Sequence, residues 1–247
     1  TWMIKESNNL YDLPTLKKVD GKYWLFYHSY PQEGYEVGPA EIGLAWTEDE
    51  ELLDWNFPDQ PIYSWKNGGD WEKGGLYKAC LLDHEGLWYL FYNAKDEGQP
   101  WFEQTGLATS KDLKHWERHP DNPLLRVTPE AWDQRFVAEP CILKDDDLWL
   151  NFYFGLGPGH AQEGLAYSKD LIHWTKHPEP IIRHGATGDY DQTHAHKASI
   201  VYWNDTLYHF YTGTRPYQQG DQTKIYQELR TILVATDKPL PPPEKEQ

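Results

Sequence analysis

Large apolar residues alternate with polar ones in four short segments of the chain, and each segment carries the pair Phe-Tyr. The pairs begin, about 60 residues apart, at Phe26, Phe91, Phe152 and Phe210. Such alternation is typical of a half-buried β-strand. A turn precedes each segment, and before the turn lies another apolar run, at residues 14–19, 79–83, 140–144 and 198–203. The pattern therefore predicts four β-hairpins.

A third strand follows each hairpin. The four copies read IGLAWT, TGLATS, EGLAYS and ILVAT and begin at residues 42, 105, 163 and 232. Before three of the hairpins an aromatic residue stands next to an acid, each aromatic 20 residues before its Phe: Trp71-Glu72, Trp132-Asp133 and Tyr190-Asp191. A repeat of this length, built of strands without a convincing helix, predicts the blades of a β-propeller.

The expected fold is all-β, a five-bladed β-propeller in which four blade repeats are evident and the fifth is partial or missing. The repeats cover about residues 10–62, 70–125, 131–183 and 189–240, within a single domain over 1–247. A four-bladed propeller fits the same pattern. The two cysteines, Cys80 and Cys141, occupy equivalent positions and are expected to be buried thiols, because two cysteines do not make a disulfide framework.

The composition restricts the classes of molecule that the chain is expected to bind. The formal net charge of −16 argues against binding to a phosphate backbone, so nucleic acid is not expected. No stretch approaches the roughly 20 apolar residues of a membrane span. Aromatic residues make up 15% of the chain, and aromatic surfaces suit sugars, although most rings are expected in the core. Neither the compartment nor the oligomeric state is readable from the sequence.

The first strand of each hairpin is expected to be the innermost strand of its blade, with its start at the central cavity. Pro14, Ala79, Pro140 and Ala198 are equivalent there. The polar residues just before them are Asp12, Tyr77, Lys78, Glu139, His196 and Lys197. Converging titratable groups make a poor core and a reasonable active site. The alternative is a salt-bridge ring that only closes the channel.

Glycoside cleavage suits this set, since it needs one carboxylate and one acid. Asp12 and Glu139 come from non-adjacent blades and are expected to face each other. His196 is an alternative acid, because its ordinary pKa of about 6.5 leaves it partly protonated near neutrality. Lys78 and Lys197 are expected to stabilise carboxylates or to bind acidic sugar groups.

Further candidates lie near the strand ends. Trp101 is a candidate sugar platform, Arg135 a candidate gate residue, and Arg215 a candidate for binding a carboxylate or sulfate. His194 and His196 are expected to point the same way in a strand and to contact substrate or, together with His160 or an acid, to bind a metal ion. No cofactor is assigned; a single structural divalent ion in the central channel is an open alternative.

The segments DLPTLKKVDGKYWLFYHS, IGLAWT and DLKHW resemble the five-bladed β-propeller glycosidases, the broad group of glycoside hydrolase families 43, 32, 68, 117 and 130. Resemblance to family 43 implies an Asp base, a tuning Asp and a Glu acid. Asp12 and Glu139 match the base and the acid, but Lys78 stands where the tuning Asp is expected. Resemblance to family 117 implies an Asp base, a tuning carboxylate and a His acid, in the order of Asp12, Glu139 and His196.

The sequence therefore predicts a glycoside hydrolase acting on plant or algal polysaccharides or oligosaccharides, with Glu139 or His196 as the acid. Two alternatives stay open. One is a carbohydrate-binding propeller without catalysis. The other is a phosphate-dependent glycoside phosphorylase, for which Lys78, His196, Lys197 and Arg215 would gather the phosphate.

Overall fold

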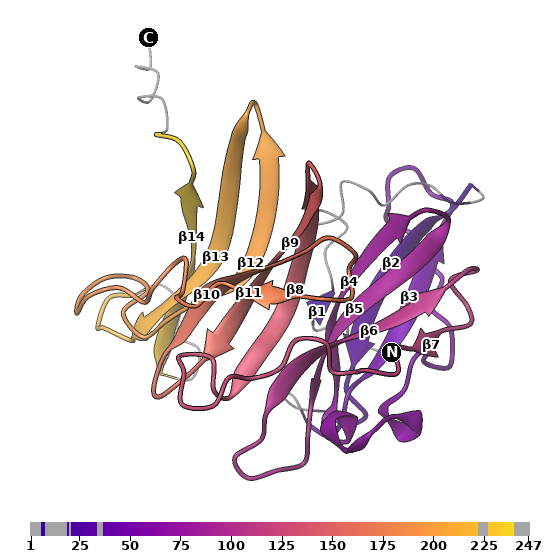
Figure 1. Ribbon diagram of the computed structural model, residues 1–247, viewed down its shortest axis with the longest axis horizontal. Helices are drawn as coiled ribbons and strands as arrows, with labels where there is room; N and C mark the ends of the chain where they lie inside the picture. Colours follow the sequence, from indigo (N-terminus) through magenta and orange to yellow (C-terminus); the bar gives the residue numbers. More distant parts are fainter. Residues whose placement is uncertain (1–5, 8–18, 20, 34–36, 222–226, 240–247) are drawn as a thin grey trace.

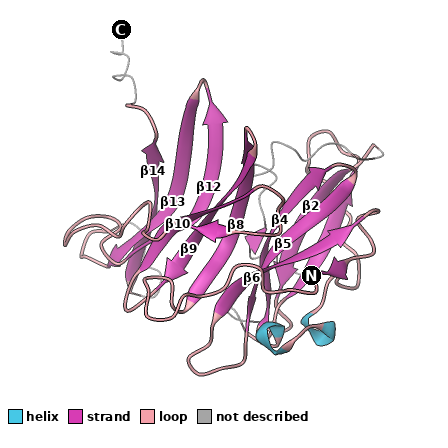
Figure 2. Ribbon diagram, viewed as in Figure 1, coloured by secondary structure: helices cyan, strands magenta, loops and turns pink. Residues whose placement is uncertain are grey.

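The chain consists almost entirely of β-strands. The computed structural model describes residues 6–7, 19, 21–33, 37–221 and 227–239. Two short 3-10 turns, Trp65–Asn67 and Asp70–Glu72, are the helical elements in this part (Figure 2). None of its helices is long and apolar enough to cross a membrane.

The strands form four successive antiparallel groups, here called blades 1 to 4. Blade 1 contains β1 (Glu6–Ser7), β2 (Tyr23–Ser29) and β3 (Glu41–Thr47). Blade 2 contains β4 (Gly75–His84), β5 (Leu87–Lys95), β6 (Glu103–Ser110) and β7 (Glu117–Arg118). Blade 3 contains β8 (Phe136–Asp145), β9 (Leu148–Leu156), β10 (Ala161–Ser168) and β11 (Thr175–Lys176). Blade 4 contains β12 (His194–Trp203), β13 (Thr206–Pro216) and β14 (Glu228–Thr236).

The predicted hairpins and third strands are confirmed in blades 2, 3 and 4. In blade 1 the predicted second and third strands are confirmed as β2 and β3, and the short β1 pairs with β2. The predicted first strand at 14–19 lies, apart from Val19, outside the described residues.

The blades follow one another in chain order across the molecule (Figure 1). Their first strands β4, β8 and β12 contact one another in succession. A single parallel bridge, Glu103 to Phe136, joins the sheets of blades 2 and 3. No sheet of the described residues is closed on itself, and blades 1 and 4 lie at opposite ends of the view. The count of five blades and the single domain over 1–247 stay predictions.

The aromatic-acid pairs are structural. The acid accepts a hydrogen bond from the Tyr of the Phe-Tyr pair, in the pairs Tyr92–Glu72, Tyr153–Asp133 and Tyr211–Asp191. Trp71 stacks on Tyr92, and Trp132 stacks on Tyr153. The glycine of the third strand leaves room for these rings, since a Cβ on Gly106 would lie 2.5 Å from Trp71. The constant spacing of 20 residues between the aromatic-acid pair and the Phe therefore reflects packing within each blade and not a binding site.

The Phe of the pair packs between blades in blades 1, 2 and 3. Phe26 of blade 1 meets Trp116 of blade 2 edge-on, with ring centroids 5.8 Å apart, and Phe91 meets Trp174 in the same way. Cys80 lies in this core and Cys141 is half-buried, so the prediction of a buried thiol is confirmed for Cys80 alone.

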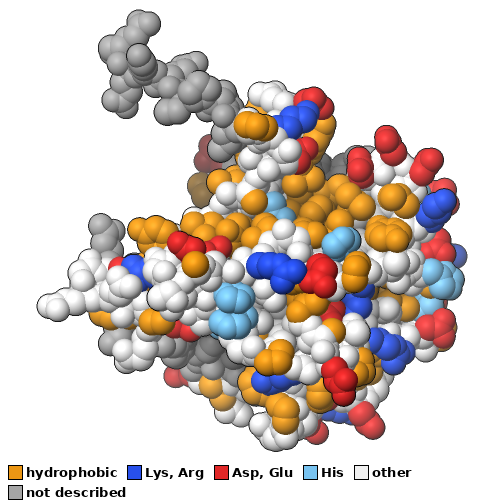
Figure 3. All heavy atoms as spheres, turned by 60° about the vertical axis from the view of Figure 1, so that its left-hand side comes forward, with side chains coloured by type: hydrophobic (Ala, Val, Ile, Leu, Met, Phe, Trp, Pro, Cys, Tyr) orange, Lys and Arg blue, Asp and Glu red, His pale blue; other side chains and the backbone are white. Residues whose placement is uncertain are grey.

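Blade 4 presents the equivalent face to solvent. Phe26 and Ile42 of blade 1 are 1% and 0% exposed, whereas the equivalent Phe210 and Ile232 of blade 4 are 36% and 76% exposed. Val234 is also exposed. Figure 3 turns this side of the molecule forward and shows hydrophobic side chains gathered on it.

Candidate functional site

The first strands of blades 2, 3 and 4 share a β-bulge at the same point. Their pairing register shifts between Tyr77 and Cys80, between Ala138 and Cys141, and between His196 and Ser199. The first residue inside each bulge has a left-handed backbone: φ is 43° at Lys78, 55° at Glu139 and 71° at Lys197. For residues other than glycine this conformation costs about 1–3 kcal/mol, and it is concentrated at functional sites.

The three bulge residues meet. The Nζ atoms of Lys78 and Lys197 lie 3.9 and 3.4 Å from Oε1 of Glu139. The Glu139 side chain is 16% exposed, so the cluster is shielded but reachable. Two ammonium groups at this range favour the charged form of a carboxyl group. The structure therefore brings together three of the residues that the sequence placed at the central cavity.

His196 lies beside this cluster and is half-buried. Burial lowers its pKa to about 3, and the charge of Lys197 acts in the same direction, against an opposing effect of Glu139. Its Nδ1–H donates to the carbonyl oxygen of Thr212, at 3.0 Å. The ring is therefore neutral near pH 7 and presents the lone pair of Nε2, which suits hydrogen-bond acceptance better than donation of an acid proton.

His194 begins β12 and lies 5.7 Å from the His196 ring, centroid to centroid. Its Nδ1 accepts the backbone N–H of Ala161, and burial lowers its pKa, partly offset by Glu228. His160 stacks on His184 at 3.7 Å instead of closing a ligand set with His194. Within the described ranges no group of three or more His, Cys, Asp or Glu side chains is arranged to hold a metal ion. The ion in the channel stays a prediction.

Trp101 holds a carboxyl group at the junction of blades 2 and 3. Its Nε1–H donates to Oε1 of Glu103, and Nδ2 of Asn93 donates to Oε2, both at 2.9 Å. Burial raises the pKa of Glu103, and the charge of Glu139 adds to this rise; the two hydrogen bonds and the charge of Lys95 oppose it. Glu103 thus keeps its proton to a higher pH than an exposed glutamate does.

Two cations flank the same tryptophan. The Nζ of Lys95 lies 5.4 Å from the ring centroids of both Tyr77 and Trp101. The guanidinium carbon of Arg135 lies 5.4 Å from the Trp101 centroid. Lys95, Trp101, Glu103 and Arg135 form a group that we call the blade 2–3 corner.

Arg215 is already engaged. Its guanidinium forms a two-pronged ion pair with Asp221, at 2.6 and 3.0 Å, and lies over the Tyr190 ring. The side chain is 8% exposed. The predicted ligand-binding guanidinium is therefore committed to a carboxylate of its own blade.

A second buried carboxyl group lies between blades 3 and 4. Glu163 on β10 is completely buried, and its Oε2 lies 3.6 Å from Nε2 of His209 on β13. Neither Glu163 oxygen nor this nitrogen has a hydrogen-bond partner among the described residues. Burial, and then the charge of Glu139, raise the pKa of Glu163 well above its usual value, and burial lowers that of His209 to about 4.

Sequence reasoning missed Lys95, Glu103, Glu163 and His209. Alignment of the repeats could have identified Glu103, because it occupies the position of Ala40 in blade 1 and of Ala161 in blade 3. Glu163 likewise stands at the place of Ile42 and Thr105. The predicted base Asp12 lies outside the described residues.

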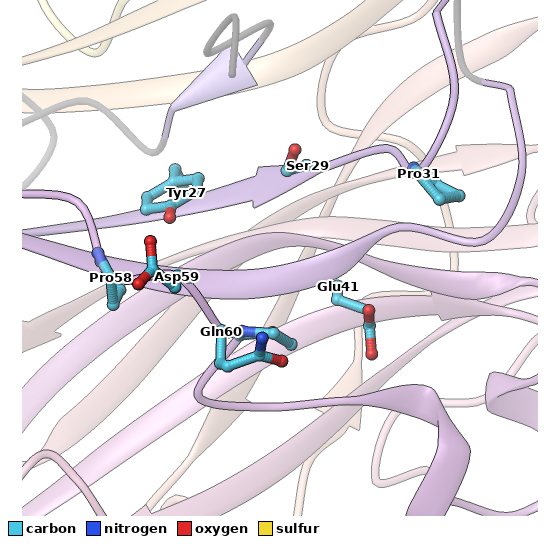
Figure 4. A pocket seen from close by; sticks show the side chains of 9 residues that line it. Tyr27, Ser29, Pro31, Glu41, Pro58, Asp59 and Gln60 are labelled. Atoms are coloured by element: carbon cyan, nitrogen blue, oxygen red, sulfur yellow. The ribbon is translucent and has the colours of Figure 1, made fainter. Parts of the chain in front are cut away.

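A pocket on blade 1 lies apart from this site (Figure 4). Tyr27, Ser29, Glu41 and Gly43 line it together with residues 58–61 and Pro31. Tyr27 follows Phe26, which packs on blade 2, so the pocket lies on the opposite face of the blade. None of the predicted site residues lines it.

Comparisons with known proteins find relatives of this chain. No family model matches the chain. The 1,2-beta-oligomannan phosphorylase of Thermoanaerobacter sp. (strain X514) is 29% identical over 126 residues, which are 48% of this chain and 42% of that protein. The Beta-1,2-mannobiose phosphorylase of the same strain is 27% identical over 135 residues, covering 48% of this chain and 43% of that protein. The chain thus matches less than half of the length of these curated relatives.

Solved structures match over more of the chain. The structure of a BT0996 RGII complex superposes with a TM-score of 0.77 at 29% identity, covering 93% of this chain and 66% of that one. A structure named "Glycoside hydrolase" gives 0.76 at 28% identity, covering 93% and 68%. The Bombyx mori GH32 beta-fructofuranosidase BmSUC1 shares the fold, with a TM-score of 0.67 at 19% identity, covering 87% and 43%. The chain has the all-β fold of the glycoside hydrolase-like propeller proteins.

Proposed function

We propose that this chain forms the catalytic propeller of an enzyme that hydrolyses glycosidic bonds, with Glu139 as an active-site carboxylate. The observation that carries the proposal is the meeting of Lys78, Glu139 and Lys197 from the same bulge of three blades, each with a left-handed backbone. An ion pair that only closes a channel needs no such backbone, whereas active sites keep it. The likeness to solved glycoside-acting propellers supports the same conclusion.

Glycoside cleavage needs one ionised and one protonated carboxyl group, and Glu139 and Glu103 supply them in this proposal. Glu139 lies between two ammonium groups, which favour the carboxylate needed to attack carbon or to activate water. Glu103 keeps its proton to a higher pH and is the candidate proton donor. Asp12 stays the base proposed from the sequence, in which case Glu139 tunes the site and the neutral His196 contacts the sugar.

Phosphorolysis is the second candidate. Ammonium groups bind phosphate as point charges, and Lys78 and Lys197 lie together at the centre of the site. Two relatives are named as phosphorylases of β-1,2-linked mannosides. The plant or algal substrate and the closer tie to family 117 or family 43 are also proposals, resting on the sequence resemblance.

The test is turnover of a panel of aryl glycosides, β-1,2-mannobiose, and plant and algal oligosaccharides, each with and without inorganic phosphate. We expect phosphate-independent release of sugar and a loss of about 10³-fold in kcat in the Glu139→Gln variant. Asp145→Asn, at the other end of β8, is the matched control and should keep full activity. Turnover that requires phosphate would establish the phosphorylase instead. Sugar binding that survives Glu139→Gln, without turnover by the wild type, would establish a binding module.

A further inference from the structure

The blade 2–3 corner holds two half-buried cations that form no ion pair with a carboxylate of the described residues. Neither Lys95 nor Arg135 forms an ion pair within the described ranges. Lys78, Lys197, Arg215 and Arg230, by contrast, each contact an acid. In a protein of net charge −16, two half-buried cations that flank one ring without an ion pair leave positive charge for a ligand.

The nearby acids are occupied elsewhere. Glu103 lies opposite Lys95 in the pairing of β5 with β6, and its two carboxyl oxygens accept hydrogen bonds from Asn93 and Trp101. Asp96, next to Lys95 in the sequence, accepts the backbone N–H groups of Gly98 and Phe102. Glu139 lies between its two lysines. Beyond the electrostatic attraction between Lys95 and Glu103, the two cations contact aromatic faces, which compensate a cation by only about 0.5–1 kcal/mol at exposed sites.

The guanidinium of Arg135 is also incompletely bonded. Its Nη2 makes one long hydrogen bond, 3.4 Å, to the carbonyl oxygen of Trp101, and its Nε is buried without a partner among the described residues. Its backbone is fixed by the bridge between blades 2 and 3, because Glu103 N donates to Arg135 O at 3.0 Å. The guanidinium group of Arg135 is therefore held in place and has N–H donors available, an arrangement that suits a planar carboxylate.

We propose that the blade 2–3 corner is the subsite that recognises the carboxylate group of an acidic sugar, with Lys95 and Arg135 as its cations and the half-buried Trp101 as its aromatic wall. The inference rests on the proposed function, since it makes the substrate of that site an oligosaccharide containing a uronic acid. Trp101 supplies ring surface for the C–H groups of the sugar. The two cations supply charge-assisted bonds that a neutral sugar cannot use.

The test is binding, independent of turnover. The indole N–H resonance of Trp101 in the ¹⁵N-labelled protein, assigned with Trp101→Phe, is titrated with D-glucuronate, with D-glucose and with inorganic phosphate. We expect glucuronate to shift this resonance at concentrations at least about tenfold lower than glucose does, and its apparent Kd to rise with salt. The double variant Lys95→Gln/Arg135→Gln should lose this preference, and Lys95→Arg should keep it.

Lys144→Gln is the matched control, because the Lys144 Nζ also lies 5.4 Å from a tryptophan ring, that of Trp149, but at the opposite end of β8. Equal binding of glucose and glucuronate, phosphate binding as tight as glucuronate binding, or an unchanged double variant would each overturn the subsite. The salt titration of the wild type needs no variant, so a folding defect in the double variant leaves the test intact. A protein that binds glucuronate through Lys95 and Arg135 yet cleaves no glycoside would reject the proposed function alone.

Discussion

Glu139 combines an unfavourable backbone with a chemical role. Its φ of 55° is the conformation that glycine adopts freely and other residues adopt at a cost. The ion pairs with the two lysines do not by themselves require this backbone. A glutamate side chain on a regular β-strand is also long enough to reach a neighbouring blade. Lys78 and Lys197 have the same left-handed backbone conformation, which indicates that the bulges direct all three side chains to one point.

Replacing Glu139 by glycine or by glutamine separates the backbone from the side chain. Both variants lose the carboxylate, so both should be inactive. Glu139→Gly should nevertheless be about 1 kcal/mol more stable than Glu139→Gln, because only glycine accepts this φ without strain. Urea unfolding followed by tryptophan fluorescence measures the difference. A glycine variant less stable than the glutamine variant would show that the backbone of residue 139 is not strained in solution.

At the scale of the element, equivalent positions of the blades carry different chemistry. Ile42 and Leu90 meet between blades 1 and 2, Thr105 and Asn151 occupy the same places between blades 2 and 3, and Glu163 and His209 occupy them between blades 3 and 4. The interface thus changes from apolar to polar to ionisable along the chain. The last pair is buried in its neutral form, which costs less than burying two ions.

The pH dependence of stability should reveal this pair. Folding raises the pKa of Glu163, so above the pKa of about 4.5 of the unfolded glutamate the folded chain keeps a proton that the unfolded chain loses, and stability falls with rising pH. Folding lowers the pKa of His209 to about 4, so stability falls with falling pH below about 6.5. The two effects offset each other between about pH 4.5 and 6.5. Above pH 6.5 the contribution of Glu163 stands alone.

We therefore expect the difference in unfolding free energy between Glu163→Gln and the wild type to grow with pH above about 4.5, in favour of the variant, because the titration of His209 is common to both proteins; the slope is about 1.4 kcal/mol per pH unit while folded Glu163 keeps its proton. Chemical unfolding at pH 5.5, 6.5 and 7.5 measures it. Glu179→Gln, an exposed glutamate, serves as the control. A constant difference across the three pH values would mean that Glu163 is ionised in the folded chain.

The repeats predicted the strands and the meeting of Lys78, Glu139 and Lys197, because a propeller superposes equivalent positions of successive blades. They did not predict the blade 2–3 corner or the Glu163–His209 pair. These groups depend on where a side chain leaves the repeat pattern, as Glu103 does at a position that is alanine in two other blades. The sequence also did not predict the lowered pKa of His196, since it follows from burial against Phe154 and from the charge of Lys197.

At the scale of the whole molecule, the row of blades ends in an uncovered face. Phe210, Ile232 and Val234 of blade 4 repeat the residues that blade 1 buries against blade 2. Ile42 and Ile232 have the same place in the repeat and opposite environments, with 0% and 76% of the residue exposed. They form a matched pair for asking whether this face is open in solution.

Ile42→Thr should destabilise the protein by at least about 2 kcal/mol, because it removes buried apolar surface and buries a hydroxyl group between blades 1 and 2. Ile232→Thr should change the unfolding free energy by less than about 0.5 kcal/mol, because a threonine in solvent loses neither packing nor hydration. Urea unfolding of both variants at several protein concentrations measures the contrast. If Ile232→Thr costs as much as Ile42→Thr, the face of blade 4 is covered in solution. A cost that grows with protein concentration would identify the cover as another copy of the protein, since only an intermolecular contact responds to concentration.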